Sequence, residues 1–137
     1  MTINQIQDEI IADFSLLDDW MDRYEMIIEM GNELDPMPES EKTPQHLIEG
    51  CQSRVWISGE LDADNRLQLQ ADSDAVIVKG IIAMLLKVLS GQTPADILHA
   101  DLYFIDKIGL KEHLSPTRSN GLLSMVRHIK LLASTLQ

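Results

Sequence analysis

The sequence predicts an α+β fold in which a small three-stranded antiparallel sheet packs against helices. Apolar residues recur at helical spacing in the first thirty or so residues and again from residue 75 onward. Between these regions, residues 46–71 change to short stretches that alternate with a period of two around a turn sequence. The 137 residues are enough for one domain, which we expect to span residues 1–137.

Two amphipathic helices are predicted at the N-terminus. The apolar stripe of the first consists of Ile3, Ile6, Ile10, Phe14 and Leu17. Ser15 and Asp18 have the spacing of a capping box, which predicts that a second helix follows. Its buried face is expected to contain Trp20, Tyr24, Ile27 and Ile28, and Gly31 is expected to end it in a left-handed conformation. Three prolines in residues 32–45 then predict an extended connection.

Three strands are predicted in the middle of the chain. Residues 46–48 form a short first strand, residues 54–60 a second and residues 66–71 a third. The sequence Asp62-Ala63-Asp64-Asn65 between the last two predicts a hairpin turn. The alternation of residues 66–71 is typical of an antiparallel strand with one buried face.

The C-terminal half is predicted to be helical. Asp72, Ser73 and Asp74 are expected to cap a buried central helix over residues 75–89, in which Gly80 indicates a close contact with the sheet. Thr93-Pro94 and Ser115-Pro116 each predict a helix start, because proline is favoured at the first helical position. Between them, a short helix or turn over residues 102–108 is expected to end at Gly109. The apolar face of the last helix is expected to contain Leu122, Met125, Val126, Ile129 and Leu132.

The charge of the chain is unevenly distributed. Residues 1–49 carry 13 acids and 2 bases, for a net charge of −11, whereas residues 50–137 carry 9 of each. Such an acidic chain with few aromatic residues is not expected to bind nucleic acid. The longest apolar stretch, residues 75–89, contains Lys79 and Lys87 and is too short to cross a membrane. No signal peptide is apparent at the N-terminus, and we expect a cytoplasmic protein.

The chain contains one cysteine, Cys51, in the run Gly50-Cys51-Gln52-Ser53-Arg54-Val55-Trp56. A single thiol excludes an internal disulfide, a CxxC redox pair and a cysteine-rich metal site. The four histidines lack metal-ligand spacing, so no metal site is predicted. A persulfide formed on Cys51 would have no neighbouring cysteine in the same chain to displace it, so it would persist until a partner took the sulfur.

The chain resembles the SufE family of sulfur acceptors, which work with cysteine desulfurases in iron–sulfur cluster assembly. The resemblance lies in the cysteine run and in the segments Asp72-Ser73-Asp74-Ala75, Ile77-Val78-Lys79-Gly80 and Ser115-Pro116-Thr117-Arg118-Ser119-Asn120-Gly121. Trp20, Tyr24 and Gly31 extend it to the N-terminal region, so nearly the whole chain is covered. The CsdE branch of the family shares these motifs. The resemblance implies a SufE/IscU-like fold.

The resemblance also implies a function. Cys51 would accept sulfane sulfur from the persulfide of a SufS/CsdA-like desulfurase, stimulate that enzyme and deliver the sulfur to a SufB-type scaffold. Pyridoxal phosphate would belong to the desulfurase, so no cofactor is expected on this chain, which would act as a sulfur-accepting accessory protein and enzyme activator and not as a stand-alone enzyme. A homodimer remains open.

The candidate site is centred on Cys51. Gly50, Gln52, Ser53 and Arg54 flank it, and Arg118 matches the family's arginine near the active loop. Either arginine would favour the thiolate, whereas Glu49 would oppose it. Asp72 and Asp74 are candidate partner contacts besides their expected capping role.

Two other functions remain open on the sequence alone. A redox-sensing or interaction domain would also use a single reactive thiol. A Cys/His hydrolase is faintly suggested by Cys-Gln-Ser-x-x-Trp, although the chain is short for a papain-like arrangement.

Overall fold

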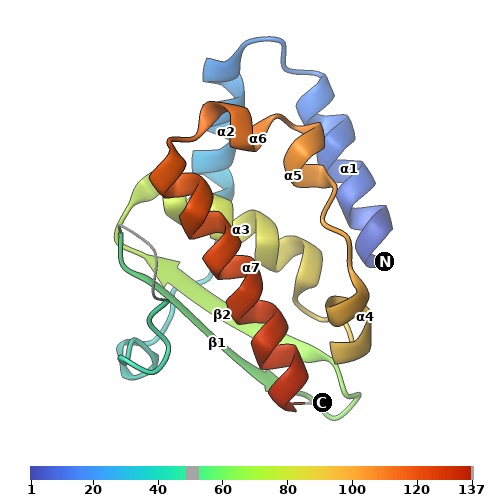
Figure 1. Cartoon of the computed structure of the whole chain (residues 1–137), viewed down its shortest axis with the longest axis vertical. Helices are drawn as coiled ribbons and strands as arrows, with labels where there is room; N and C mark the ends of the chain where they lie inside the picture. The colour runs from blue at the N-terminus through green and yellow to red at the C-terminus, as the bar shows by residue number, and fades with distance from the viewer. Residues whose placement is uncertain (49–52, 137) are drawn as a thin grey trace.

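The computed structural model describes residues 1–48 and 53–136. Figure 1 shows two N-terminal helices, a hairpin and a mainly helical C-terminal half. The elements in chain order are α1 (Ile3–Ser15), α2 (Trp20–Asn32), the 3-10 helix η1 (Glu39–Glu41), β1 (Val55–Leu61), β2 (Leu67–Ser73), α3 (Val76–Leu89), α4 (Pro94–His99), α5 (Phe104–Lys107), α6 (Leu110–His113) and α7 (Pro116–Leu136).

The sheet has two strands in the described part of the chain, which corrects the prediction of three. β1 and β2 pair antiparallel with Val55 opposite Ser73 and Leu61 opposite Leu67, around the predicted turn. Residues 46–48 contribute only an isolated bridge between Leu47 and Trp56. The pairing does not extend toward the N-terminus because the His46 N–H turns back to the Thr43 carbonyl at 3.1 Å.

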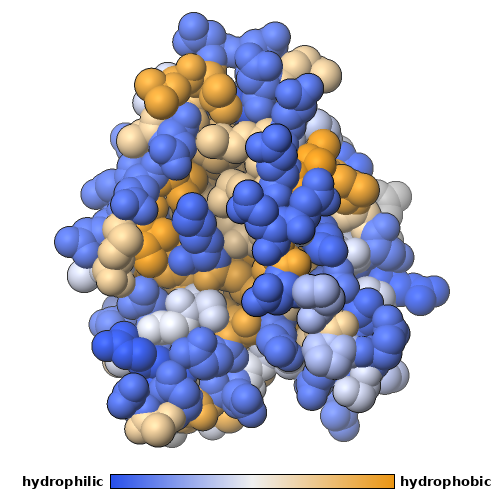
Figure 2. Space-filling view, turned by 180° about the vertical axis from the view of Figure 1, so that it is seen from behind, coloured by the Kyte–Doolittle hydropathy of each residue, from blue (hydrophilic) through white to orange (hydrophobic). Residues whose placement is uncertain are grey.

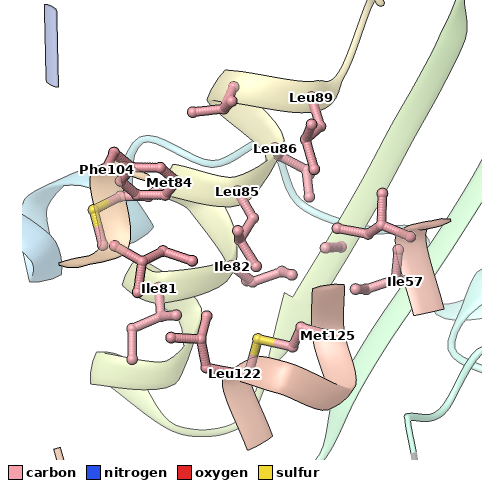
Figure 3. Packing of buried hydrophobic residues seen from close by; sticks show 14 of the residues in the cluster. Ile57, Ile81, Ile82, Met84, Leu85, Leu86, Leu89, Phe104, Leu122 and Met125 are labelled. Atoms are coloured by element: carbon pink, nitrogen blue, oxygen red, sulfur yellow. The ribbon is translucent and has the colours of Figure 1, made fainter. Parts of the chain in front are cut away.

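The hydrophobic core lies between the hairpin and the helices. Val55, Ile57 and Leu67 are fully buried on the inner face of the sheet. The central helix α3 packs on this face, and Figure 3 shows its Ile82 and Leu85 side chains among those of Ile57 and Met125. The prediction of a buried helix over residues 75–89 is therefore confirmed. Its eleven buried residues leave little of its surface to solvent.

Three predicted helix starts are confirmed or corrected by the hydrogen bonds at the caps. The Thr93 hydroxyl accepts from the Asp96 N–H, and Ser115 Oγ accepts from the Arg118 N–H, so both Xaa-Pro predictions are confirmed. The prediction that Ser15 and Asp18 form a capping box for α2 is wrong, because Asp19 caps that helix by accepting a hydrogen bond from the Met21 N–H. Ser15 instead donates to the Ala12 carbonyl at the end of α1.

α2 and α3 cross at two glycines, and both sequence expectations for these residues are wrong. Gly31 lies inside α2, whose last residue is Asn32 and whose C-cap residue, Glu33, has αR backbone angles. A Cβ on Gly31 would lie 2.7 Å from the Gly80 nitrogen, and one on Gly80 would meet the carbonyl of Ile27. The glycine in α3 therefore permits close approach of α2, and not of the sheet.

Polar side chains cover most of the face of the molecule drawn in Figure 2. Figure 2 shows a largely hydrophilic face on which apolar patches are separated by polar side chains. Leu16 and Met21, between and at the start of the first two helices, are among the exposed large apolar residues. Within residues 1–48 and 53–136, no helix combines the length and the hydropathy needed to cross a bilayer.

Candidate functional site

The candidate site is bordered by Ile48 and Ser53, the two described residues on either side of residues 49–52, which contain Cys51 and which we call the reactive run. The predicted site residues Gly50, Cys51 and Gln52, together with Glu49, lie outside the described residues. Immediately before the reactive run, the buried Ile48 donates its N–H to the Val55 carbonyl at 2.8 Å. The segment that leads into the run is thus fixed to the start of β1.

The segment that leaves the run is fixed by the last residue of β2 and the residue after it. The Arg54 N–H donates to Asp74 Oδ1 at 3.0 Å, and Ser73 Oγ donates to the Arg54 carbonyl at 2.8 Å. Asp74 and Ser73 therefore bind the backbone of Arg54. The expectation that Asp72, Ser73 and Asp74 cap the next helix is wrong, because the N-cap residue of α3 is Ala75 and has no side-chain cap.

Asp72, the other candidate partner contact, is largely buried and ion-paired. Its carboxylate lies 3.0 Å from Lys42 Nζ and 3.5 Å from Lys79 Nζ. Burial raises the pKa of this carboxyl, but the hydrogen bonds from Lys42 and the Ser73 N–H and the charge of Lys79 outweigh it and lower the pKa overall. The carboxylate therefore stays ionised and binds two lysines from different parts of the chain.

A small pocket of about 50 Å³ lies beside Ser53. Its apolar wall comes from α3 and α7, and Arg118 from the first turn of α7 adds a positive charge. Figure 3 shows two of the wall residues, Ile81 on α3 and Met125 on α7, in the layer of apolar side chains between these helices. The lining residues are Ser53, Val78, Ile81, Thr117, Arg118, Gly121 and Met125. The structure thus brings together two predicted site residues, Ser53 and Arg118.

Arg118 is held in place by a residue that the sequence analysis assigned to the core. Its guanidinium donates to the Tyr24 hydroxyl at 3.1 Å. Tyr24 in turn lies next to Trp20, with ring centroids 6.2 Å apart, and Trp20 stacks on His113 at 3.8 Å. The i, i+4 spacing of Trp20 and Tyr24 placed both on one helix face, but only the tertiary structure connects that face to Arg118.

Two histidines lie close to β1 and to the segment that enters the reactive run. His46 accepts the Ile57 N–H at its carbonyl, and its ring lies 3.6 Å from Glu41. The pKa of His128 on α7 is lowered, mainly because the side chain is partly buried. The charge of His46 lowers this pKa further, whereas a backbone hydrogen bond with Ile57 raises it. In the described ranges, no group of three or more His, Cys, Asp or Glu residues is arranged to bind a metal ion.

The lowered pKa of His128 predicts a loss of stability on mild acidification. The unfolded chain takes up a proton near the ordinary value of 6.5, whereas the folded chain does so only at lower pH. The stability that the neutral His128 side chain contributes to the fold is therefore complete above pH 6.5 and is lost as the pH falls toward the folded-state pKa. Urea unfolding between about pH 7.5 and 5 should show this slope. His128→Gln should flatten it, and the exposed-residue control His99→Gln should not; equal slopes in all three proteins would contradict the prediction.

The comparison with known families decides the identity of the chain. Residues 8–133 match the family model described as "SufE: Fe-S metabolism associated domain". The chain belongs to the SufE family. Uncharacterized SufE-like proteins of Rhizobium meliloti and Rhizobium etli are 44% and 43% identical to it over 128 and 127 residues. These alignments cover 90% of this chain in each case and 91% and 86% of the relatives.

A solved structure supports the fold of this SufE-family chain. The solution structure of a hypothetical protein from Thermus thermophilus superposes with a TM-score of 0.79 at 19% sequence identity. The match covers 96% of this chain and 95% of the other. The family assignment from sequence is therefore confirmed, together with the α+β fold and an association with iron–sulfur metabolism.

Proposed function

We propose that the protein accepts sulfane sulfur as a persulfide on Cys51, stimulates the cysteine desulfurase that donates it, and delivers the sulfur to an iron–sulfur cluster scaffold. The observation that carries this proposal is the SufE family match, which spans the run containing the single cysteine of the chain. We further propose that residues 1–137 act as one domain in the cytoplasm.

The chemistry is a thiol–disulfide exchange in which sulfur is the transferred group. The Cys51 thiolate attacks the terminal sulfur of the donor persulfide, a new S–S bond forms on Cys51, and the donor S–S bond breaks. The donor cysteine leaves as a thiolate, so no external oxidant or reductant is consumed. Transfer to the scaffold repeats the step with Cys51 as the leaving thiolate.

The described surroundings of the reactive run support this role. Cys51 comes two residues before Ser53, and two peptide units span at most about 7 Å, so a partner must approach the end of the molecule where Ser53 lies. Arg118 lines the pocket beside Ser53, and Arg54 is exposed next to it. Two positive charges near this end favour a thiolate and an anionic persulfide.

The expected partners follow from the same chemistry. The sulfur donor is a pyridoxal-phosphate enzyme of the SufS/CsdA type, which brings the cofactor, and the acceptor is a scaffold of the SufB type. We propose no cofactor or metal on this chain. A homodimer of this chain would have to leave the Ser53 end accessible to both partners.

The test is a mass spectrum of the intact chain after incubation with a cysteine desulfurase and free cysteine. The expected product is the chain with one added sulfur atom that reductant removes and that Cys51 alkylation prevents. Cleavage of peptide substrates without sulfur uptake would instead favour the hydrolase. Neither activity, or oxidation of the thiol alone, would favour the redox-sensing or interaction domain.

A further inference from the structure

Asp72 joins three parts of the molecule at the end of the sheet nearest the reactive run. It lies in β2 opposite Trp56, and its side chain is only 12% exposed. Lys42 reaches it from the segment before β1, and Lys79 reaches it from the first turns of α3. A carboxylate with so little exposure is stabilised by opposite charges, which these two lysines supply.

Lys42 is more restrained than a lysine on a protein surface. Its side chain is 21% exposed, and its ammonium group lies 5.6 Å from the centre of the Trp56 ring. Glu39 makes a second ion pair with it at 3.2 Å. Together these contacts fix the segment that includes η1 to the sheet, on the side away from α3 (Figure 1).

The segment fixed by Lys42 continues directly into the reactive run. Beyond a turn at Thr43, the His46 carbonyl accepts the Ile57 N–H at 2.9 Å and the Ile48 N–H donates to Val55. On the other side of the run, Asp74 and Ser73 bind the backbone of Arg54. β1 therefore binds the backbone at the entry of the run, and Ser73 and Asp74 bind the backbone at its exit, while Asp72 of β2 reaches the entry segment through Lys42.

We propose that Asp72 is a positioning residue for Cys51. Its ion pair holds Lys42 beside Trp56 and so fixes the segment that leads into the reactive run. Asp74 has the corresponding role for the segment that leaves the run, through its bond to the Arg54 N–H. The proposal depends on the sulfur-acceptor function above. Group transfer between two proteins requires both sulfurs to be placed within bonding distance and in line, so loss of this anchor reduces the rate of transfer within the complex. The reaction of the same thiol with a small, freely diffusing reagent has no such requirement.

The first measurement is hydrogen exchange in the protein alone. In Asp72→Asn, the amides of Ile48 and Ile57 should exchange about fivefold faster, while amides of α7 keep their wild-type rates. Asp62→Asn is the matched control, because this carboxylate accepts bonds from Arg66 and Gln68 at the opposite end of the same hairpin. Its effect should be confined to the turn. Faster exchange throughout the molecule in Asp72→Asn would overturn the proposal, as would no change at Ile48.

The second measurement compares two reactions of the thiol. In Asp72→Asn, the maximal rate of sulfur uptake from a persulfidated desulfurase should fall about tenfold, with the half-saturating concentration unchanged. The rate of alkylation by iodoacetamide should stay within about twofold of wild type, and Asp72→Glu should restore most of the uptake. Equal loss in both reactions, or full uptake in Asp72→Asn, would overturn the assignment.

A second variant separates folding defects from positioning. Lys42→Met removes the same ion pair from the more exposed side and leaves Asp72 paired with Lys79, so the fold is expected to persist. Lys42→Met should also slow sulfur uptake while leaving the rate of alkylation near the wild-type value, and any other result would overturn the proposal. If the wild-type chain takes up no sulfur, the sulfur-acceptor function fails, whereas the exchange measurement still decides whether Asp72 fixes the entry segment.

Discussion

Replacing Cys51 with serine is expected to abolish sulfur uptake completely. The chain has no other cysteine, and a serine hydroxyl is neither ionised near neutral pH nor able to form a persulfide. Intact-mass spectra after incubation with desulfurase and cysteine should show the unmodified chain at all times. Stimulation of desulfurase turnover should be lost as well, because the enzyme persulfide then has no acceptor.

A relocated thiol provides the control for this variant. Ser134 is exposed on α7, and the double variant Cys51→Ser, Ser134→Cys retains one free thiol per chain away from the reactive run. It should be alkylated by iodoacetamide but should take up no sulfur from the desulfurase. Transfer to the relocated thiol at the wild-type rate would show that any exposed cysteine suffices, and the proposed role of the run around Cys51 would be wrong.

Short-range signals predicted most of the secondary structure. The starts of α4 and α7 are fixed by a capping hydroxyl followed by proline, and the hairpin turn by Asp and Asn residues within four positions. Errors arose where a tertiary contact decided the outcome. Glycine is common at helix ends, but Gly31 lies inside α2, where the backbone of Gly80 leaves no room for a Cβ. The four-residue helix α6 has no periodicity long enough to be predicted.

The residues of the candidate site also divide into those that local sequence predicts and those that only the fold brings together. The family resemblance predicts Cys51, Arg54 and Arg118 as site residues from local sequence, and the structure brings Arg118 to the pocket beside Ser53. Sequence alone did not connect Tyr24 with Arg118, which are 94 positions apart. The carboxylates of Asp72 and Asp74 resembled caps because short acidic side chains favour both helix starts and loop anchors. Only the folded chain shows that these carboxylates bind Lys42 and the Arg54 backbone.

The crossing of α2 and α3 predicts the largest effect on stability. Gly80→Ala improves helix propensity by about 1 kcal/mol, but the new methyl would meet the Ile27 carbonyl and lie 2.6 Å from its Cγ2. A backbone atom cannot rotate away, so the two helices must separate along the core. We expect the free energy of unfolding to fall by about 2–3 kcal/mol, at the upper end of overpacking effects. Thermal and urea unfolding followed by circular dichroism would measure this loss.

The same substitution elsewhere in the chain tests the cause of that loss. A Cβ on Gly59 would lie 3.0 Å from Leu69 Cδ2, the end of a flexible side chain, so Gly59→Ala should cost less than half as much as Gly80→Ala. Gly31→Ala should resemble Gly80→Ala, since its Cβ would lie 2.7 Å from the Gly80 nitrogen. Because either methyl separates the same pair of helices, the double variant should lose less than the sum of the two. Additive losses, or a stable Gly80→Ala protein, would contradict a backbone contact at this crossing.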